Sequence, residues 1–340
     1  MVAVGRRLIT AVVACSLALG VSGCVSAGRP ETGATTKAVA YAPPSAIAPY
    51  LSAVHKARAL GLDVWLDADL AGRWRAGPAT FRAGVAQVAR LADATGVQGV
   101  RVANELGQGD PWWTTSRLTA FFADVDASLR SRTGRRLQIA VDVVVPELGC
   151  LPGSSSVGAL ACRADALKDP ITLTSLGAVA SGGHLDRLIV GPDLLDPAVY
   201  RSWGTSVDQA ATAAWQTLLA QPWASQVDIQ ARKALTFPLP YDSAASAAAD
   251  LPTACDVPLD AGVPSMDVWA WQRTYQGVTV GLLGPNASTN PLWAGLQSRA
   301  DRGDVLYTQF SPSQVRTSVS SDLRTIASVF SGVYIAAGTG

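Results

Sequence analysis

Hydrophobic and polar residues alternate along a series of short segments of this chain. The clearest one spans residues 99–106, where Val100 and Val102 fall on one side of an extended strand and Arg101 and Glu105 on the other. A Gly-rich loop that carries two tryptophans follows it directly. The pattern therefore predicts a strand that delivers a carboxylate to its carboxyl end.

Stretches with apolar residues at helical spacing separate these segments. Residues 78–94 and 115–133 are two examples, and Gly96 and Gly134 are typical helix stops. Each predicted strand is followed by such a helix, the last covering residues 321–335. The eight predicted strands are 37–42, 63–70, 97–105, 137–145, 185–193, 227–235, 266–272 and 304–310.

Eight strands that alternate with helices predict an α/β fold, a (β/α)8 TIM barrel. A doubly wound open sheet is the alternative, but its strands are buried under helices on both faces and should be apolar on both sides. These strands are apolar on one side only. Val64 and Leu66, for example, alternate with Trp65 and Asp67. A barrel with a polar lumen accounts for that alternation.

The amino terminus has the pattern of an export signal. Arg6 and Arg7 precede an apolar run at 8–19, and Val-Ser-Gly-Cys follows, ending at Cys24. This pattern resembles the signal peptide and lipobox of bacterial lipoproteins. The resemblance implies a signal peptide at 1–23, a lipid on Cys24 and attachment to the bacterial cell membrane on its extracytoplasmic side. An ordinary secretory peptide is the alternative.

The rest of the mature chain divides in two. Residues 24–36 are rich in Ser, Gly, Thr and Ala and predict a flexible tether, and 37–340 form the barrel domain. Outside the cytoplasm disulfides persist, so Cys150 and Cys162 are predicted to pair across one Pro/Gly/Ser-rich loop. A bridge from Cys255 to either of them is the alternative.

Composition excludes some classes of partner. Hydrophobic residues make up 49% of the 340 residues and charged residues 16%, with a net charge of +1. This balance allows a large core and gives no electrostatic reason to expect nucleic acid as a partner. The chain has two histidines, too few to favour a His-based catalytic triad or a His-rich metal site. No cofactor is expected.

In a TIM barrel the carboxyl ends of the strands form the functional face. Polar and aromatic residues gather there, with Arg101 and Arg232 as candidates to compensate the acids. Indole rings stack on sugars and carboxylates accept sugar hydroxyls, so this set indicates a carbohydrate ligand or substrate. The residues expected at this mouth are Asp67, Asp69, Asn104, Glu105, Trp112, Trp113, Asp142, Asp193, Trp271 and Gln309.

Asn104-Glu105 after a barrel strand resembles the Asn-Glu pair of the large clan of retaining TIM-barrel glycoside hydrolases. The resemblance implies that Asn104 binds a sugar hydroxyl and that Glu105 is the acid/base. The pair ends the third predicted strand, whereas the clan has it on the fourth. The stretch 268–274 also lacks the clan's nucleophilic Glu. Asp142 on the neighbouring strand is therefore the predicted second carboxylate.

Other interpretations stay open beside a lipid-anchored glycoside hydrolase-like protein. The missing Glu favours a non-catalytic glycan-binding or envelope-organising lipoprotein, and a transporter's solute receptor is a third possibility. Asp142 is also a candidate ion-pair partner for an inward arginine. Asp67, Asp69 and Asp142 have the oxygen ligands that a hard metal ion prefers. The distance between the two catalytic carboxyl groups would decide between retaining and inverting hydrolysis.

Overall fold

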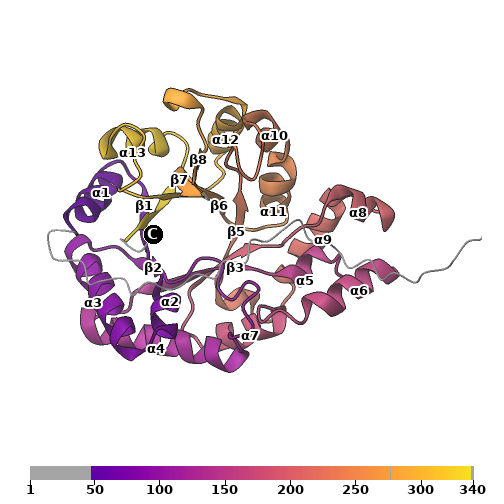
Figure 1. Ribbon diagram of the computed structural model, residues 1–340, viewed down its shortest axis with the longest axis horizontal. Coiled ribbons are helices and arrows are strands. Elements are labelled where there is room, and N and C mark those ends of the chain that lie inside the picture. The colour runs from indigo at the N-terminus through magenta and orange to yellow at the C-terminus, as the bar shows by residue number, and fades with distance from the viewer. Residues whose placement is uncertain (1–46, 276, 338–340) are drawn as a thin grey trace, which may run out of the picture. The chain divides into compact units, whose positions relative to one another are not determined.

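The computed structural model describes residues 47–275 and 277–337, and within them eight parallel strands close a barrel (Figure 1). The closure is direct, because β1 pairs with β10 on one side and with β2 on the other. This confirms the (β/α)8 barrel and excludes the open sheet. The barrel strands are β1 (Asp63–Asp67), β2 (Gly99–Arg101), β3 (Gln138–Val144), β4 (Arg187–Gly191), β5 (Asp228–Ala234), β6 (Met266–Trp269), β9 (Leu306–Phe310) and β10 (Gly332–Ala336).

Helices surround the barrel, and local sequence sets their ends. In α4, Thr114 accepts from the Arg117 amide at the start, and Gly134 at φ 63° ends the helix. None of the helices in the described part of the chain is long and apolar enough to span a bilayer. The helices are α1 (Ala48–Ala59), α2 (Leu70–Arg75), α3 (Pro78–Thr95), α4 (Thr115–Thr133), α5 (Pro146–Gly149), α6 (Val157–Ala166), α7 (Leu173–Ser181), α8 (Pro197–Ser202), α9 (Val207–Leu219), η2 (Ala224–Gln226), α10 (Ala244–Ala249), η3 (Pro252–Asp256), α11 (Val257–Asp260), η4 (Pro285–Ala287), α12 (Pro291–Asp301) and α13 (Val319–Ala327).

The barrel has the predicted number of strands, but its eight strands are not the eight predicted ones. The predicted first strand, 37–42, lies outside the described residues, and β1 is the predicted second strand. The helix predicted over 321–335 is wrong beyond Ala327, because α13 ends there and β10 follows. β10 contains Val333, Tyr334 and Ile335, which are β-branched or aromatic residues that favour strands. The shift makes Glu105 follow the second barrel strand.

The predicted one-sided alternation of the strands is confirmed. Val64 and Leu66 of β1 are buried between the barrel and its helices, together with Phe81 and Val85 of α3. Full burial of a side chain of this size contributes about 1.5–3 kcal/mol. The opposite side of β1 faces the lumen, so the polar lumen is framed by a continuous apolar layer.

Aromatic rings fill the barrel below its mouth. Trp65 of β1 packs against Tyr334 of β10, with ring centroids 6.2 Å apart, and Tyr307 packs on Tyr334 at 5.7 Å. The Trp65 ring passes over Gly99, where a Cβ atom would lie 2.3 Å from it. Glycine at this point of β2 is therefore required by the close approach of the indole. This layer closes the lumen beneath the polar residues.

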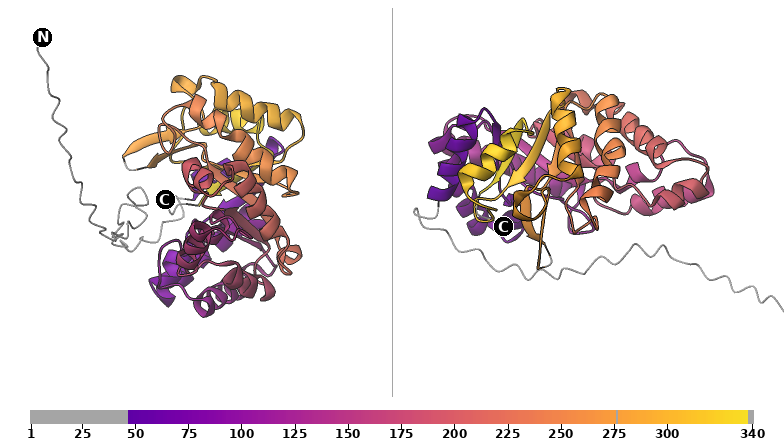
Figure 2. Two further views of the ribbon diagram at one scale, coloured as in Figure 1. Left: turned by 90° about the vertical axis from the view of Figure 1, so that its right-hand side faces the viewer. Right: turned by 90° about the horizontal axis from the view of Figure 1, so that it is seen from above.

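A small antiparallel hairpin follows β6 (Figure 2). It consists of β7 (Gln272–Tyr275) and β8 (Val278–Gly281), and Gly281 also bridges to Phe237 in the loop after β5. The strand predicted over 266–272 ends earlier, at Trp269. The two residues after Trp269 lead into the hairpin. Side chains of β7 are thus placed at the carboxyl end of the barrel.

The predicted disulfide is present. Cys150 at the end of α5 is bonded to Cys162 in α6, with Cα atoms 5.5 Å apart. Cys255 in η3 is a buried free thiol. The alternative bridge from Cys255 is therefore excluded, and the bond ties α6 to the end of α5.

Candidate functional site

Five charged side chains from different strands meet inside the barrel near the carboxyl ends of the strands. Each lies at an inward position of its strand, and none is more than 8% exposed. Charges buried this deeply are found in proteins when they are paired. The five are Asp67 of β1, Arg101 of β2, Asp142 of β3, Arg232 of β5 and Asp267 of β6.

Arg101 is the inner cation of this group. Its Nε lies 3.0 Å from Oδ1 of Asp67 and its Nη2 lies 2.8 Å from Oδ2. Its Nη1 donates to Asp267 at 2.9 Å. Burial alone would raise the pKa of Asp67, but the charge and hydrogen bonds of Arg101 outweigh it and hold that pKa below its usual range. Asp67 is therefore ionised at neutral pH.

Arg232 is the outer cation, and it joins a buried carboxyl to an exposed one. Its Nε lies 2.7 Å from Oδ2 of Asp142, which is completely buried. Its Nη1 lies 3.0 Å from Oε1 of Glu105, whose side chain is 47% exposed. One guanidinium therefore contacts both predicted catalytic carboxylates.

Asp142 differs from Asp67 in how its charge is compensated. Neither of its oxygens makes a hydrogen bond of acceptable geometry with any part of the chain that the structure describes. Burial raises the pKa of Asp142 to about 7, and the nearby carboxylates of Glu105 and Asp267 add to this rise. The charges of Arg232 and Arg101 act in the opposite direction and are outweighed. The site thus holds a buried carboxyl that titrates near neutrality.

Glu105 has an unusual backbone conformation. Its φ is +47°, in the left-handed region that a residue with a Cβ atom seldom adopts. The amide of the next residue, Leu106, donates to the Asp142 carbonyl at 2.9 Å, which fixes the loop on β3. Residues held in this region cluster at functional sites, so the strain directs attention to Glu105.

A polar and aromatic layer lies over Asp67. The Asn104 amide donates to Oδ1 of Asp67 at 3.1 Å, and the Gln309 amide donates to Oδ2. Gln309 in turn accepts from the indole nitrogen of Trp269 at 2.7 Å. Three strands are thereby connected at the mouth through side chains.

Trp269 also contacts two arginines. The guanidinium carbon of Arg273, on β7, lies 4.2 Å from the centre of the indole ring, and that of Arg232 lies 5.4 Å away. Both distances are within the range of cation–π contacts. The ring therefore holds two positive groups beside the exposed carboxylate of Glu105.

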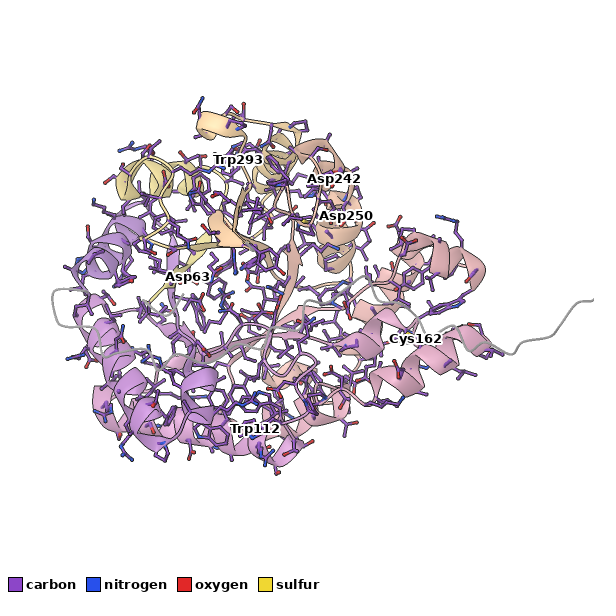
Figure 3. All side chains as sticks on the ribbon, in the orientation of Figure 1. Asp63, Trp112, Cys162, Asp242, Asp250 and Trp293 are labelled. Carbon is purple, nitrogen blue, oxygen red and sulfur yellow. A yellow bond between two sulfur atoms is a disulfide. The ribbon has the colours of Figure 1, made fainter. Side chains whose placement is uncertain are left out.

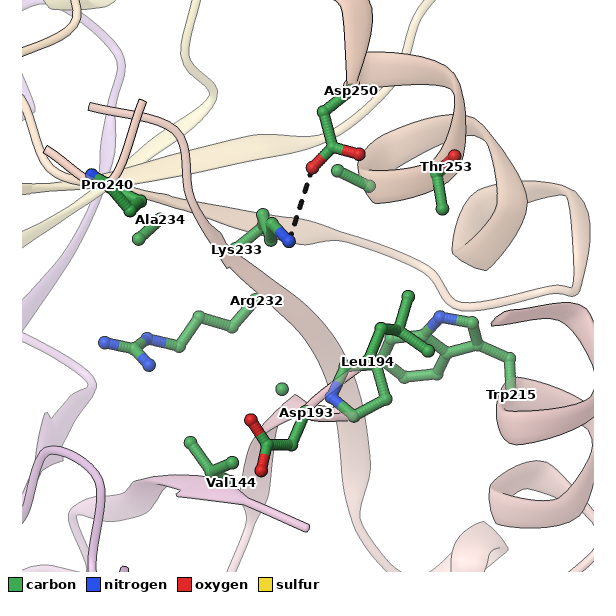
Figure 4. A pocket seen from close by; sticks show the side chains of 13 residues that line it. Val144, Asp193, Leu194, Trp215, Arg232, Lys233, Ala234, Pro240, Asp250 and Thr253 are labelled. Carbon is green, nitrogen blue, oxygen red and sulfur yellow. Dashed lines mark ion pairs between the residues drawn. The ribbon is translucent and has the colours of Figure 1, made fainter. Parts of the chain in front are cut away.

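A cavity of about 220 Å³ opens beside this group (Figure 4). The ends of β3, β4 and β5 line it, and Arg232 contributes one wall. Lys233 points toward Asp250, and its ammonium lies 3.3 Å from that carboxylate. Asp193 also lines the cavity, with a backbone φ of +47°. The cavity can hold a small molecule next to the charged mouth.

The structure brings together five of the residues predicted for the mouth and separates others from them. Asp69 caps α2 by accepting from the Gly72 amide at 2.8 Å. Asp193 lies in the adjoining cavity. The residues that meet through direct contacts or a shared partner are Asp67, Asn104, Glu105, Asp142 and Gln309.

The three tryptophans predicted as a stacking platform lie elsewhere. Trp271 is 1% exposed, packs on Trp293 of α12 and donates its indole N–H to Asp322 at 3.1 Å. Trp112 and Trp113 pack with Trp74 of α2, beside α4 (Figure 3). The shared platform is therefore wrong, because Trp271 follows the end of β6 and turns into the helix layer.

Three residues at the mouth are absent from the predicted site: Asp267, Trp269 and Arg273. The two-residue alternation of β6 places Asp267 and Trp269 on the lumen side and is the signal that identifies them. Arg273 lies on a hairpin that the sequence pattern did not predict, so no periodicity identifies it.

The described residues offer no arrangement for a bound metal. They contain no group of three or more His, Cys, Asp and Glu side chains suited to hold an ion. Asp69, one of the proposed oxygen ligands, is used as a helix cap. His184 pairs with Asp126 at 2.9 Å on the helix layer.

Comparison with known proteins gives a fold and no family. No protein-family model matches the chain, and no curated protein does. A solved lyase/mutase structure from Burkholderia cenocepacia J2315 matches at 13% identity and TM-score 0.43, over 85% of this chain and 83% of its own. A 2,3-dimethylmalate lyase matches at 12% and 0.41, over 85% and 80%. A β-1,4-D-mannanase from Cryptopygus antarcticus matches at 10% and 0.41, over 81% and 83%.

The comparisons as a whole correct the predicted function. The solved structures named above include a lyase/mutase and a 2,3-dimethylmalate lyase beside the mannanase, and at this level of similarity they indicate the fold and no activity of this chain. No sequence family or curated relative supports a hydrolase. The prediction of a glycoside hydrolase is therefore wrong, and the displaced tryptophans remove the structural reason for a sugar-binding platform.

Proposed function

We propose that this chain is an enzyme that transfers protons to and from a small molecule at the carboxyl-end mouth of its barrel. Glu105 is the acid/base that touches the substrate, and Asp142 is a buried carboxyl coupled to it. The observation that carries the proposal is the position of Arg232, which lies 3.0 Å from Glu105 and 2.7 Å from Asp142.

The shared guanidinium links the two protonation states. When Glu105 is ionised, its negative charge raises the pKa of Asp142. When Glu105 takes a proton from substrate, that charge disappears, and the positive charges of Arg232 and Arg101 are opposed by one carboxylate fewer. The pKa of Asp142 then falls, so its proton is released more readily. The protonation of the buried carboxyl therefore depends on the charge of the acid/base above it.

The difference in exposure between Glu105 and Asp142 supports different roles for the two residues. Glu105 is half exposed at the mouth, whereas Asp142 is completely buried beneath Arg232. A substrate therefore reaches Glu105 and not Asp142. Asp142 acts on the reaction through Arg232 and is a positioning residue. The strained backbone of Glu105 supports the same assignment, because the fold maintains it at a cost.

Hydrogen exchange into small carbon acids tests this proposal without a known substrate. The protein is incubated in D2O with a panel of 2-oxo acids, 2-hydroxy acids and aldehydes, and loss of C–H signals is followed by proton NMR. We expect exchange in at least one compound class, loss of it in E105Q and a shifted pH profile in D142N. D165N is the matched control, because Asp165 is 80% exposed and, among the described residues, its carboxylate forms an ion pair with Lys168 alone.

Two results would contradict the proposal. One is the absence of exchange across the whole panel at every pH between 5 and 9. The other is exchange that E105Q retains at the wild-type rate, because the proton would then be handled by another group.

We further propose that the protein is exported and anchored to the membrane by lipid on Cys24. The basic and apolar segments before Cys24 support this, although they lie outside the described residues. The Cys150–Cys162 bond also supports it, since such bonds persist outside the cytoplasm. Labelling bacterial cells with a palmitate analogue tests it. Label in the wild type and none in C24A is the expected result, and equal label in both would refute the anchor.

A further inference from the structure

Arg273 of β7 stands beside the proposed acid/base without an acceptor of its own. Within residues 47–275 and 277–337 its guanidinium has no ion pair or hydrogen bond, and its Nε is shielded from solvent with no partner. Its contacts are the rings of Trp269 at 4.2 Å and Tyr275 at 5.5 Å.

The other arginines that stack on aromatic rings in the described chain are all provided with acceptors. Arg117, for example, lies 4.6 Å from the Trp112 ring and donates to the Trp112 carbonyl at 2.5 Å. Arg101 and Arg232 are paired with carboxylates. The same holds for Arg75 with Asp110, Arg187 with Asp228, and Arg316 with the carbonyls of Leu283 and Gly284. Arg273 is the exception to this pattern.

A partly buried guanidinium without an acceptor is unfavourable. Arginine stays charged in proteins, and removing a charge from water costs free energy unless hydrogen bonds replace the lost ones. Burial lowers the pKa of Arg273, and Arg232 nearby acts in the same direction. The charge of Glu105 acts against both. The guanidinium of Arg273 can therefore still take oxygen acceptors at the mouth, next to Glu105.

We propose that Arg273 binds the oxyanion of the substrate, a carboxylate or a phosphate, and holds the substrate against Glu105. The binding of an oxyanion by Arg273 does not depend on the proposed proton transfer. The description of that oxyanion as part of a substrate does. The planar fork of an arginine matches both oxyanions, and stacking on Trp269 restricts its orientation. Arg232, which contacts the same indole ring, adds positive potential while it stays paired with Glu105 and Asp142.

This assignment selects among substrates. A neutral molecule would leave the guanidinium without acceptors, so the mouth discriminates against it. An anion at Arg273 would also keep the substrate beside a negatively charged Glu105. Such an arrangement suits removal of a proton close to the oxyanion.

Arginine side-chain NMR tests the proposal in the folded chain. The probes are malonate and inorganic phosphate, each added at constant ionic strength with chloride as the balancing ion. The Nε–H signal absent from R273K identifies Arg273 in the wild type. We expect this signal to move on addition of at least one probe, with binding about 10- to 100-fold weaker in R273M. A response to malonate identifies a carboxylate site, and a response to phosphate alone identifies a phosphate site.

Matched variants separate this proposal from the proposed catalysis. R117K removes another arginine stacked on a tryptophan and should bind the probe as the wild type does. E105Q should abolish hydrogen exchange and still bind the probe. No movement of the Arg273 signal with either probe would overturn the oxyanion site, and so would equal binding by R273M and wild type. R273K covers the case in which R273M does not fold, and it should bind at least several-fold more weakly because a lysine lacks the fork.

Discussion

Arg101 and Asp67 form a two-point ion pair inside the barrel, with Nε–Oδ1 at 3.0 Å and Nη2–Oδ2 at 2.8 Å. The two residues lie on neighbouring strands, β2 and β1, and are directly opposite in register. The guanidinium also lies over Tyr334, 4.4 Å from its ring centre. This pair anchors the polar layer on which the proposed site stands.

Replacing Arg101 by Met should strongly destabilise the protein. The change leaves the carboxylates of Asp67 and Asp267 buried without their cation, and breaking such a pair typically costs about 3–5 kcal/mol. Urea unfolding followed by circular dichroism measures the loss. K168A is the control, because Lys168 and Asp165 are both more than three-quarters exposed and should contribute at most about 1 kcal/mol. A loss below about 1 kcal/mol in R101M would contradict this account.

The buried carboxyl of Asp142 should make stability fall as pH rises from about 4 to 7. Below this window Asp142 is protonated in the folded and unfolded states alike. Within it the folded state keeps the proton that the unfolded state has lost, because its pKa is about 7 against the usual 3.8. The folded state thus binds more protons, and its relative stability decreases by up to about 4 kcal/mol.

D142N isolates this contribution, since other acids titrate in both proteins. The difference in unfolding free energy between D142N and the wild type should shift in favour of the variant from pH 4 to pH 8. Urea titrations at one-unit pH intervals measure it. A difference that stays constant over this range would show that Asp142 has an ordinary pKa.

Much of the barrel's polar interior could be predicted from alternation alone. Asp67 and Asp142 face the lumen because every second residue of a strand points to the same side. The same parity places Asp267 and Trp269 inside. What alternation cannot give is which charges pair, since Arg101 contacts Asp267, 166 residues away, across the lumen. Partner choice depends on strand register, which the sequence pattern leaves open.

The errors lie where a regular pattern stops. Trp271 continues the inward parity of β6, but the strand ends at Trp269 and the chain turns, so the indole packs against α12. The sequence pattern predicts a helix across the final strand, because apolar residues continue past Ala327 without a break in composition. Arg273 follows the turn after β6. Its place at the mouth depends on the β7–β8 hairpin, which the alternation of hydrophobic and polar residues does not predict.

Trp271 should stabilise the fold and not bind a ligand. W271F removes the hydrogen bond to Asp322 and part of the contact with Trp293, and we expect a loss of about 1–3 kcal/mol in unfolding free energy. W112F, at a half-buried ring, should cost less. Thermal unfolding compares the two. Unchanged stability of W271F, together with weaker binding of a ligand, would restore the role first predicted from the sequence.

The Cys150–Cys162 bond should contribute to stability by restricting the unfolded chain. The two residues are 12 positions apart, and closing a loop of about 15 residues is worth about 3 kcal/mol in the chain-entropy description. The wild type should therefore unfold at a lower temperature when a phosphine reductant is present. The C150A/C162A variant should unfold at that lower temperature with or without reductant.

C255A is the matched control: its buried thiol is not bonded, so it should respond to reductant as the wild type does. If C150A/C162A unfolded at the temperature of the oxidised wild type, the bond would have no role in stability. The loop between α5 and α6 would then be held by other contacts, such as the hydrogen bonds from Arg163 to the carbonyls of Leu151 and Ser154.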